Sequence, residues 1–441
     1  MSSHEVVAKI AAKIRHDRRI LVGFSGGIDS SVLLHVLVSL RAQQYPDLQL
    51  RAVYIHHGLS RHAQAWAEHC QAQCSKWQVE LQVVHVHVDP SESGIEAAAR
   101  QARYQAISDL MNDDEILVTA QHQDDQCETF LLALKRGSGP AGLSAMPERM
   151  PFGVHQQVRP MLDISRPQIE VYAKEHRLTW VDDESNIDDR YERNFFRLRV
   201  LPVIQQRWQH FPRMVARSAS LCAEQENLLD ELLNPLLATL IFDDGAIDIN
   251  GLQAFSAAKR RAILRRWFSQ QHVTMPSQEQ LEKLWHEVAL SKPDAEPELQ
   301  LDNYQVRRYR QRLYLLPSMQ PLDTVSLEWN GRSVLLLPDK LGQLKLADSG
   351  IAVRAPKNNE KVSVRFSASG SLNLRIVGRS HSRTLKKLWQ ELQVPTWQRQ
   401  RTPLLFYGET LIAAIGVFVT ADGQSSADNA VWVIQHDKNI V

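Results

Sequence analysis

The sequence lacks long apolar segments and any large excess of one charge. Its longest apolar run near the C-terminus, Leu411 to Val419, is far shorter than the ~20 residues that a membrane span needs. The N-terminal segment is charged and amphipathic, without the apolar core of a signal peptide. Lysine and arginine number 51, and aspartate and glutamate 50, which excludes a uniformly basic nucleic-acid binder but permits local basic patches. We therefore expect a soluble, cytoplasmic protein that does not contact membranes.

Cysteine is also scarce, and the residues that occur form no C-x-x-C pair. They are Cys70, Cys74, Cys127 and Cys222. So small a set builds no disulfide framework in a chain of this length, and it fits a reducing compartment. A metal site would need more ligands than Cys70 and Cys74 provide. The absence of C-x-x-C also disfavours sulfur transfer, which uses reactive cysteines or an iron–sulfur cluster.

A chain of 441 residues is too long for one typical core, so two or three domains are expected. Apolar runs alternate with helical segments in the N-terminal part, which predicts an α/β domain with a doubly wound, mostly parallel sheet. The pattern is largely helical from Arg197 to Leu290 and changes to short strands after Val325, where Asn330-Gly331 predicts a hairpin. We predict a catalytic domain over residues 1–215, a mainly helical domain over 216–318 and a small α+β domain over 319–441.

The stretch LVGFSGGIDSSVLLHVL, Leu21 to Leu37, predicts a buried strand joined to a helix by a glycine-rich turn. Glycine allows backbone angles and close approaches that a side chain would block. The helix that begins near Asp29 offers unpaired N–H groups and the positive end of its dipole, which favour a phosphate. Because the turn lacks the lysine of a Walker loop, it should hold a different part of a nucleotide or support a different reaction. The predicted phosphate-binding residues are Ser25, Gly26, Gly27, Ile28, Asp29 and Ser30.

Two further turns follow predicted strands, His56-His57-Gly58 and Ala120-Gln121-His122. Ligands of doubly wound sheets bind at the carboxyl ends of the strands, so all three turns should line one crevice. The segment from Arg136 to Glu148 is rich in glycine, serine and proline, as is typical of a mobile loop or lid. Ser93 and Glu96 have the spacing of a helix capping box.

Several motifs, in order along the chain, resemble those of one enzyme family. SGGIDS, Ser25 to Ser30, resembles the PP-loop of ATP pyrophosphatases, which cleave ATP to AMP and pyrophosphate. The further motifs are YIHHGLS, EAAARQARY, TAQHQDDQCET, RGSGPAGLSAM, RPMLDISR, DDESNIDDRYERNFFR and RTLKKLWQELQVPTWQRQRTPLL. With them the chain resembles the tRNA(Ile)-lysidine synthetases over nearly its whole length. The resemblance implies an adenine nucleotide α-hydrolase-like fold for the first domain.

The resemblance also implies a reaction. ATP would adenylate the oxygen on carbon 2 of the wobble cytidine in an isoleucine tRNA with a CAU anticodon, releasing pyrophosphate. The amino group of free lysine would then displace AMP. The implied ligands are ATP, Mg²⁺, L-lysine and that tRNA, and both a monomer and a homodimer stay open. A tRNA thiolase that uses the same adenylation is the nearest alternative.

Asp29, His122, Asp124 and Asp125 are the candidates for chemistry in the crevice. A carboxylate among phosphates suggests Mg²⁺ between them, so Asp29 is a candidate metal ligand, and it is equally a candidate helix N-cap. One of the two adjacent aspartates is expected to orient the cytosine or a metal, and the other to take the proton of the lysine ammonium, whose pKa is normally ~10.4. A solvated capping turn is the alternative for that pair. His122 either donates to phosphate or braces the turn.

Basic clusters elsewhere are candidates for tRNA contacts. Arg193, Asn194 and Arg197 suit phosphate or active-site contacts, with helix-surface ion pairs to Asp188, Asp189 and Glu192 as the alternative. Arg307, Arg308, Arg310 and Arg312 form a second cluster. The C-terminal part interleaves basic and aromatic residues, which favours RNA contacts, although Trp389 is expected in the core. The predicted tRNA-binding residues there are Arg379, Arg383, Lys386, Lys387, Trp397 and Arg399.

Overall fold

The computed structural model describes residues 3–58, 60, 62–87, 95–292, 295–425 and 430–438. They belong to two compact units, Met1–Glu231 and Leu232–Val441. No helix within the described ranges is long and apolar enough to cross a bilayer. The predicted capping box needs Ser93, which lies outside these ranges.

The first unit is built on a six-stranded sheet with the strand order β3-β2-β1-β4-β6-β5. The strands are β1 (Arg19–Gly23), β2 (Gln49–His56), β3 (Glu80–His85), β4 (Ile116–Val118), β5 (Arg149–Phe152) and β6 (His155–Val158). Neighbouring strands are parallel except for β5 and β6, which are antiparallel. The predicted mostly parallel sheet is therefore confirmed.

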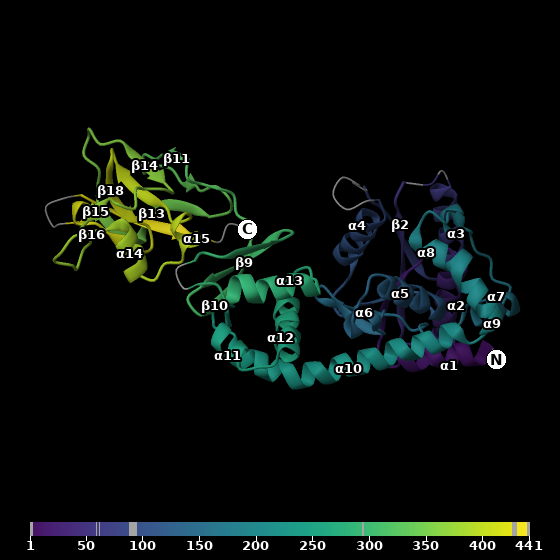
Figure 1. The fold of residues 1–441 in the computed structure, drawn as a ribbon. Coiled ribbons are helices and arrows are strands. Elements are labelled where there is room, and N and C mark those ends of the chain that lie inside the picture. The colour runs from purple at the N-terminus through teal and green to yellow at the C-terminus, as the bar shows by residue number, and fades with distance from the viewer. Residues whose placement is uncertain are drawn as a thin grey trace. The chain divides into compact units, whose positions relative to one another are not determined.

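Helices pack on both faces of this sheet. Because alternate residues of a strand point to opposite faces, Ile20 and Val22 of β1 enter one core and Leu21 another. The first core includes residues of α1 (Ser3–Ile14), α2 (Ile28–Gln43), α3 (Ala63–Lys76) and α7 (Arg166–Glu175). The second core includes Ile107 of α4 (Ile95–Leu110). Figure 1 accordingly shows β2 between α4 and α3, the arrangement of a doubly wound fold.

The glycine-rich turn lies where the strand order reverses. The chain passes from β1 to β2 on one side of it and reaches β4 on the other side. Open α/β sheets bind their ligands at such a switch point, outside the carboxyl ends of the strands. The turns after β1, β2 and β4 therefore end at neighbouring positions along one edge of the sheet, as the sequence predicted.

The rest of the first unit is helical and irregular. The further helices are α5 (Gln123–Lys135), α6 (Pro140–Leu143), α8 (Glu192–Phe195), a π-helical turn (Phe196–Val200) and α9 (Leu201–Arg207). The predicted loop from Arg136 to Glu148 includes α6. Near its end, Gln126 and Met146 exchange two hydrogen bonds of 2.8 Å, which tie the loop to α5. The long helix α10 (Phe211–Leu240) continues across the boundary between the two units.

The second unit begins with the mainly helical region that the sequence predicted. Its helices are α11 (Ile249–Gln253), α12 (Ala257–Gln270), α13 (Gln278–Lys283) and a π-helical turn (Leu284–Ala289). They enclose a core that contains Trp267 and Phe268. A four-stranded sheet completes this region in the order β7-β10-β9-β8. Its strands are β7 (Ile247–Asp248), β8 (Glu298–Leu301), β9 (Tyr304–Tyr309) and β10 (Arg312–Pro317).

The C-terminal region combines small sheets with two short helices. A five-stranded sheet has the order β11-β14-β17-β18-β19, and a three-stranded sheet the order β12-β13-β20. The strands are β11 (Ser326–Glu328), β12 (Leu335–Leu336), β13 (Gln343–Arg354), β14 (Val362–Arg365), β17 (Leu404–Tyr407), β18 (Thr410–Ala414), β19 (Phe418–Val419) and β20 (Val431–Asp437). A two-stranded ladder of β15 (Asn373–Leu374) and β16 (Arg383–Thr384) precedes α14 (Leu385–Glu391) and α15 (Thr396–Arg399).

The hairpin predicted at Asn330-Gly331 is wrong. Gly331 does adopt the left-handed φ of +72° that such a turn needs. However, β11 pairs with β14, and β12 pairs with β13, so the strands on the two sides of the turn belong to different sheets. The Asn-Gly signal located a turn correctly but could not specify the strand partners.

Candidate active site

The turn after β1 presents the free end of a helix. Gly26 has a φ of +79°, and its carbonyl accepts a hydrogen bond of 3.0 Å from the Val181 N–H. Gly27 is the N-cap of α2, so that no side chain caps this helix within the described chain. The hydroxyls of Ser25 and Ser30 lie 3.2 Å apart beside it. The first N–H groups of α2 and its dipole are thus available to an anion.

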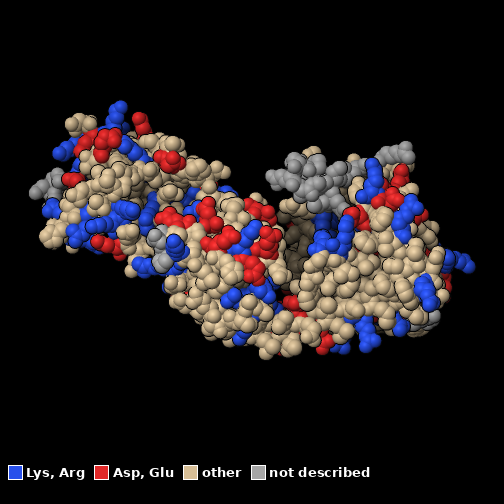
Figure 2. Space-filling view, in the orientation of Figure 1, with Lys and Arg blue, Asp and Glu red and all other residues tan. Residues whose placement is uncertain are grey.

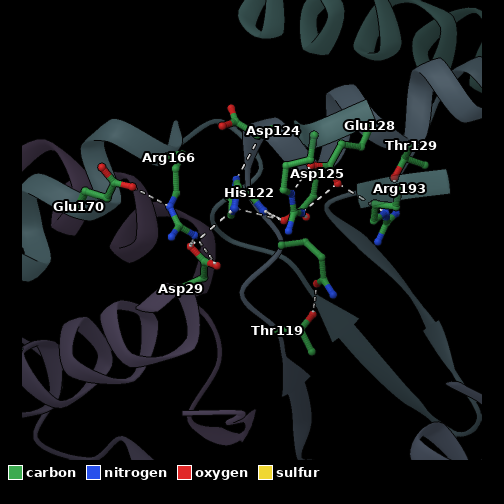
Figure 3. A network of polar contacts seen from close by, with 12 residues as sticks. Asp29, Thr119, His122, Asp124, Asp125, Glu128, Thr129, Arg166, Glu170 and Arg193 are labelled. Atoms are coloured by element: carbon green, nitrogen blue, oxygen red, sulfur yellow. Dashed lines mark hydrogen bonds and ion pairs between the residues drawn. The ribbon is translucent and has the colours of Figure 1, made fainter. Parts of the chain in front are cut away.

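Asp29 lies in the first turn of α2 and contacts side chains from two distant segments. Nη1 of Arg166, at the start of α7, donates to its two carboxylate oxygens at 3.0 and 3.1 Å. Nε2 of His122 lies 3.6 Å from Asp29 Oδ1. The N-cap interpretation of Asp29 is therefore wrong, because Gly27 holds that position and the carboxylate faces Arg166 and His122 (Figure 3).

His122 braces the turn that opens α5. Its backbone N–H donates to Asp125 Oδ2 at 3.0 Å, and its Nδ1 accepts from the Asp124 N–H at 3.2 Å. An imidazole that accepts at Nδ1 carries its proton on Nε2 when it is neutral. That atom lies 3.6 Å from the Asp29 carboxylate and 3.5 Å from the Asp125 carboxylate. The buried ring therefore links the acidic groups of α2 and α5.

Glu128 and Asp125, one turn apart on α5, share an arginine. Arg197 donates to both oxygens of Glu128 at 2.6 and 3.0 Å and to Asp125 Oδ1 at 3.1 Å. Nε of Arg193 lies 3.5 Å from Glu128, and its Nη2 donates to Thr129 at 2.9 Å. The Glu128 side chain is 0% exposed, and this burial raises its pKa against the opposing effect of Arg197.

Asp124 differs from its neighbour. Among the described residues its carboxylate makes no hydrogen bond or ion pair, and it points away from the Asp29–His122–Asp125 group (Figure 3). Burial raises the pKa of the Asp124 carboxyl, partly offset by His122, and Asp125 raises it further. A partly buried carboxylate with a raised pKa is a better base than an ordinary surface aspartate.

Arg193 and Arg197 do not pair with the acidic residues that the ion-pair alternative named. Their partners are instead carboxylates of α5. Of the acids predicted as their partners, Asp188 pairs with Arg190, Asp189 with Arg199 and Glu192 with Lys135. Asn194 lies between the two arginines in sequence but has a different role. It is 9% exposed, and its amide nitrogen donates to the carbonyls of Ser185 and Asp188 at 2.7 and 2.9 Å. Asn194 thereby fixes the loop before α8.

No group of three or more histidine, cysteine or acidic side chains among the described residues is arranged to hold a metal ion. Magnesium does not require such a group at a nucleotide site, since it is bound through one or two carboxylates together with phosphate oxygens and water. The Asp29 side chain, 31% exposed at the phosphate turn, fits that requirement. Direct coordination by Asp29 would compete with its ion pair to Arg166.

Three of the four cysteines are unsuited to sulfur chemistry. Cys70, Cys74 and Cys127 are buried, and burial raises the pKa of each thiol to about 12. The reactive form of cysteine is the thiolate, which such surroundings disfavour. Cys70 has a packing role instead, because a side chain at Gly26 would place its Cβ 2.9 Å from the Cys70 sulfur.

The residues predicted to contact tRNA in the C-terminal region differ in accessibility. Lys386 and Lys387 are exposed on α14, whereas Arg379 and Arg383 share the carboxylate of Glu391. Figure 2 shows lysine and arginine side chains gathered over the part of this region that contains α14 and α15. Arg399 is half-buried and donates to the Val394 carbonyl at 2.8 Å. We call Arg379, Arg383, Lys386 and Lys387 the basic face.

The tryptophans of this region lie in its interior. Trp389 is buried, as predicted. Trp397 is 3% exposed, and its ring packs against Tyr309 and Tyr314, with centroids 6.0 and 5.1 Å away. Trp397 therefore supports two tyrosines and presents no free face on which a base could stack directly.

Arg166 and Glu128 belong to the site but were not among the predicted site residues, although they lie in the motifs RPMLDISR and TAQHQDDQCET. Arg166 is the second residue of Ser165-Arg166-Pro167, and its partner Asp29 is 137 positions away in the chain. Glu128 lies one helical turn after Asp125, a spacing that puts both on one face of α5. This spacing could have predicted that Glu128 lies at the site. No local sequence pattern could have predicted that Arg166 contacts Asp29.

Family models match three separate parts of the chain. A family model described as a PP-loop domain matches residues 2–204. A model described as a TilS substrate binding domain matches residues 247–314, and one described as a TilS substrate C-terminal domain matches residues 362–436.

Similar proteins extend over the full length. A tRNA(Ile)-lysidine synthase of Edwardsiella ictaluri is 56% identical over 100% of both chains. Those of Serratia proteamaculans and Pectobacterium atrosepticum are 56% and 58% identical, over 98% and 95% of both chains respectively. Among solved structures, a U34-tRNA thiolase of Methanococcus maripaludis aligns with a TM-score of 0.42 at 16% identity, over 50% of this chain and 78% of that one. This structural similarity is too weak to support any inference about the present chain.

Proposed function

Because the chain belongs to the tRNA(Ile)-lysidine synthase family, we propose that it joins free lysine to carbon 2 of the wobble cytidine in an isoleucine tRNA with a CAU anticodon. The reaction uses ATP and releases AMP and pyrophosphate. The observation that carries this proposal is the lysine-free phosphate turn, whose Asp29 is linked through His122 to the carboxylates of α5.

In the first step, the cytosine oxygen attacks the α-phosphorus of ATP, and the bond from that phosphorus to pyrophosphate breaks. The residues from Ser25 to Ser30 hold the phosphates through the N–H groups of α2 and the two hydroxyls. Arg166 offers guanidinium donors beside this turn, and Asp29 orients it. Mg²⁺, when bound with ATP at Asp29, supplies charge neutralisation for the departing pyrophosphate.

In the second step, the lysine nitrogen forms a bond to carbon 2, and AMP departs with the electrons of the carbon–oxygen bond. Only the neutral amine can attack, so the ammonium, with a pKa of ~10.4, must first lose a proton. We assign Asp124 as the proton acceptor, because its carboxylate is unpaired within the described residues and its pKa is raised. Asp125 is engaged by His122 and Arg197 and serves to hold the turn.

Arg193 and Arg197 keep the carboxylates of α5 in place, while the basic face holds the tRNA body. Two arginines against Glu128 and Asp125 offset the cost of placing these charges close together in a partly buried site. The exposed lysines of α14 supply the salt-dependent part of RNA affinity.

A tRNA thiolase is disfavoured by the same chemistry. It would need a reactive thiol or a cluster site, but Cys70, Cys74 and Cys127 are buried with pKa values raised to about 12. The remaining cysteine, Cys222, belongs to α10 and has no cysteine within C-x-x-C spacing.

Mass analysis of the anticodon-loop fragment, after incubation with ATP and CAU-anticodon tRNA, tests the proposal. With lysine present the fragment should gain the mass of lysine less that of water, and without lysine it should carry an AMP adduct. An unchanged fragment under both conditions would contradict the proposal. Equal incorporation of ornithine or ammonia would contradict the assignment of lysine as the amine.

A further inference from the structure

A pocket lies within the second unit, far along the chain from the phosphate turn. It has a volume of about 270 Å³ and is lined by the β9–β10 hairpin, the loop around Gln393 and α15. Its lining residues are Asp244, Tyr309, Arg310, Arg312, Tyr314, Gln393, Pro395 and Gln398. We call it the hairpin pocket. Apart from Asp244, the lining residues fall in two different family-model matches, residues 247–314 and 362–436.

Two residues at this pocket occupy backbone conformations that normally favour glycine. Arg310, at the tip of the hairpin, has a φ of +56°, and Gln393 has a φ of +59°. Gln393 follows the C-cap of α14, where its N–H donates to the Gln390 carbonyl and the Val394 N–H donates to the Trp389 carbonyl. That is a Schellman motif, in which glycine is usual at the position of Gln393.

The side chains of these two left-handed residues contact each other. Arg310 Nη1 donates to Gln393 Oε1 at 2.9 Å, so that the two left-handed residues meet. Both side chains are exposed. A left-handed backbone is disfavoured for a non-glycine residue and persists when the surrounding structure holds it in place. Conflicts between local preference and the residue present are expected at functional sites.

The remaining walls are aromatic and polar. Tyr309 and Tyr314 are half-buried and rest on the buried ring of Trp397, which keeps them in place. Arg312 is already engaged, since its guanidinium carbon lies 3.5 Å from the centre of the Phe242 ring and its Nη1 lies 3.6 Å from Asp244. Arg310 contacts Gln393 and lies over the Tyr309 ring, with its guanidinium carbon 5.6 Å from the ring centre, but it is exposed and has no carboxylate partner among the described residues. It is therefore the lining cation that an incoming anion can reach.

We propose that the hairpin pocket binds one unstacked nucleotide of the substrate tRNA, with the base against Tyr309 and Tyr314 and the phosphate on Arg310. Aromatic side chains stack bases of any identity, and arginine binds phosphate through paired donors. Asp244 and the amides of Gln393 and Gln398 can hydrogen-bond the edge of a base. The proposal rests on tRNA being the substrate, as argued above, and adds a contact made far along the chain from the phosphate turn.

The variant Arg310→Gly provides a direct test, because glycine suits the left-handed backbone and the fold should be retained. Affinity for the CAU-anticodon tRNA should fall by about tenfold or more, as expected for the loss of a hydrogen bond to a charged group. The slope of the logarithm of affinity against the logarithm of salt concentration should decrease by about one, as expected for the loss of one phosphate contact. Gln393→Gly should act in the same direction but more weakly, since Gln393 orients Arg310 and carries no charge itself.

Lys340→Gly is the matched control. Lys340 is also basic, exposed and left-handed, with a φ of +57°, and it belongs to the second unit but not to the pocket lining. Unchanged affinity in Arg310→Gly, or an equal loss in both variants, would overturn the hairpin pocket as a nucleotide site. The melting temperatures of both variants should equal or exceed that of the unmodified protein.

Cross-linking by ultraviolet light locates the contact. Irradiation of the full chain with the tRNA should attach a nucleotide to the peptide that contains Tyr309 and Tyr314, and Arg310→Gly should abolish the attachment. Cross-links confined to other peptides would refute the proposal. If the unmodified enzyme binds tRNA at this peptide but forms no lysidine, the proposed reaction fails and the pocket stands. If the unmodified enzyme forms lysidine while Arg310→Gly binds tRNA normally, the proposed reaction stands and the pocket as a nucleotide site fails.

Discussion

Asp124 and Asp125 are adjacent in sequence but have different surroundings. Asp125 accepts from the His122 N–H and from Arg197, whereas the Asp124 carboxylate has no partner among the described residues. Burial raises the pKa of Asp124, so the folded protein binds that proton more tightly than the unfolded chain. The stability contributed by protonated Asp124 is therefore fully present below its unfolded pKa of ~3.9 and is lost as the pH rises through its folded pKa.

Asp124→Asn should consequently raise the melting temperature at neutral pH, and this gain should shrink as the pH falls through the folded pKa of Asp124 and be absent below about 4. The same variant should also slow the lysine step, because asparagine cannot accept the proton of the lysine ammonium. Asp125→Asn is the matched control and should lower the melting temperature, because it weakens the pair with Arg197. Thermal unfolding across this pH range tests both, and a lower melting temperature for Asp124→Asn at neutral pH would refute the assignment.

Asp29→Asn should abolish AMP formation and leave tRNA binding nearly intact. The change removes the charge that orients Arg166 and the candidate magnesium ligand. The effect on folding should be small, because both side chains of the pair are about a third exposed. Asp163→Asn, which alters another partly exposed ion-pairing aspartate in the first unit, is the control. Turnover of Asp29→Asn at the rate of the unmodified enzyme would remove Asp29 from the mechanism.

At the residue scale, the sequence predicted the groups that lie next to one another along the chain. The glycine turn, Asp29, His122 and the Asp124-Asp125 pair all follow strands, and their chemistry could be inferred from that position. The partners of these groups could not be inferred, because Arg166 reaches Asp29 across 137 positions and Arg197 reaches Glu128 across 69. Such contacts depend on how the helices pack, which a local pattern does not encode.

At the scale of elements, the two glycines of the phosphate turn should differ in their tolerance of substitution, because their backbone conformations differ. Gly26→Ala should be destabilising by about 1–2 kcal/mol, since an L-residue is disfavoured at a φ of +79°. Its Cβ would also lie 2.9 Å from Cys70 Sγ and 3.1 Å from Val181 Cγ2. Gly27→Ala, at a φ of −70° with its nearest neighbour 3.5 Å away, should fold nearly normally. Equal melting temperatures for the two variants would contradict this account of the turn.

Strand and helix positions in the first unit were predictable, whereas pairing in the C-terminal region was not. Parallel strands with buried apolar runs and intervening helices follow a restricted topology, which the sheet order of the first unit obeys. The short strands around Asn330-Gly331 carry too few residues to specify their partners, and they join two different sheets. The boundaries predicted at residues 215 and 318 stay predictions.

At the scale of the whole molecule, the phosphate turn lies in the first unit, whereas most of the predicted tRNA contacts lie in the second unit. With nearly equal numbers of basic and acidic residues, RNA affinity must come from local surfaces such as the basic face. Arg379 and Arg383 are partly neutralised by Glu391, so Lys386 and Lys387 should contribute most of it.

Replacing Lys386 and Lys387 together by alanine should weaken tRNA binding and reduce the salt slope by roughly two phosphate contacts. Replacing Arg332 and Lys340 by alanine removes the same charge from another exposed part of the second unit and is the control. Titrations at several salt concentrations measure the slope. A slope unchanged by the α14 variant, or reduced equally by the control, would count against the basic face.

The central claim is that a lysine-free glycine turn directs bond breaking to the innermost phosphorus of ATP and so activates a base oxygen. Its most direct test is to follow ATP labelled in the α-phosphate during incubation with CAU-anticodon tRNA. The account predicts pyrophosphate release, label on the tRNA before lysine is added, and transfer of that label to free AMP afterwards. Formation of ADP and orthophosphate, with no label on the tRNA, would contradict it.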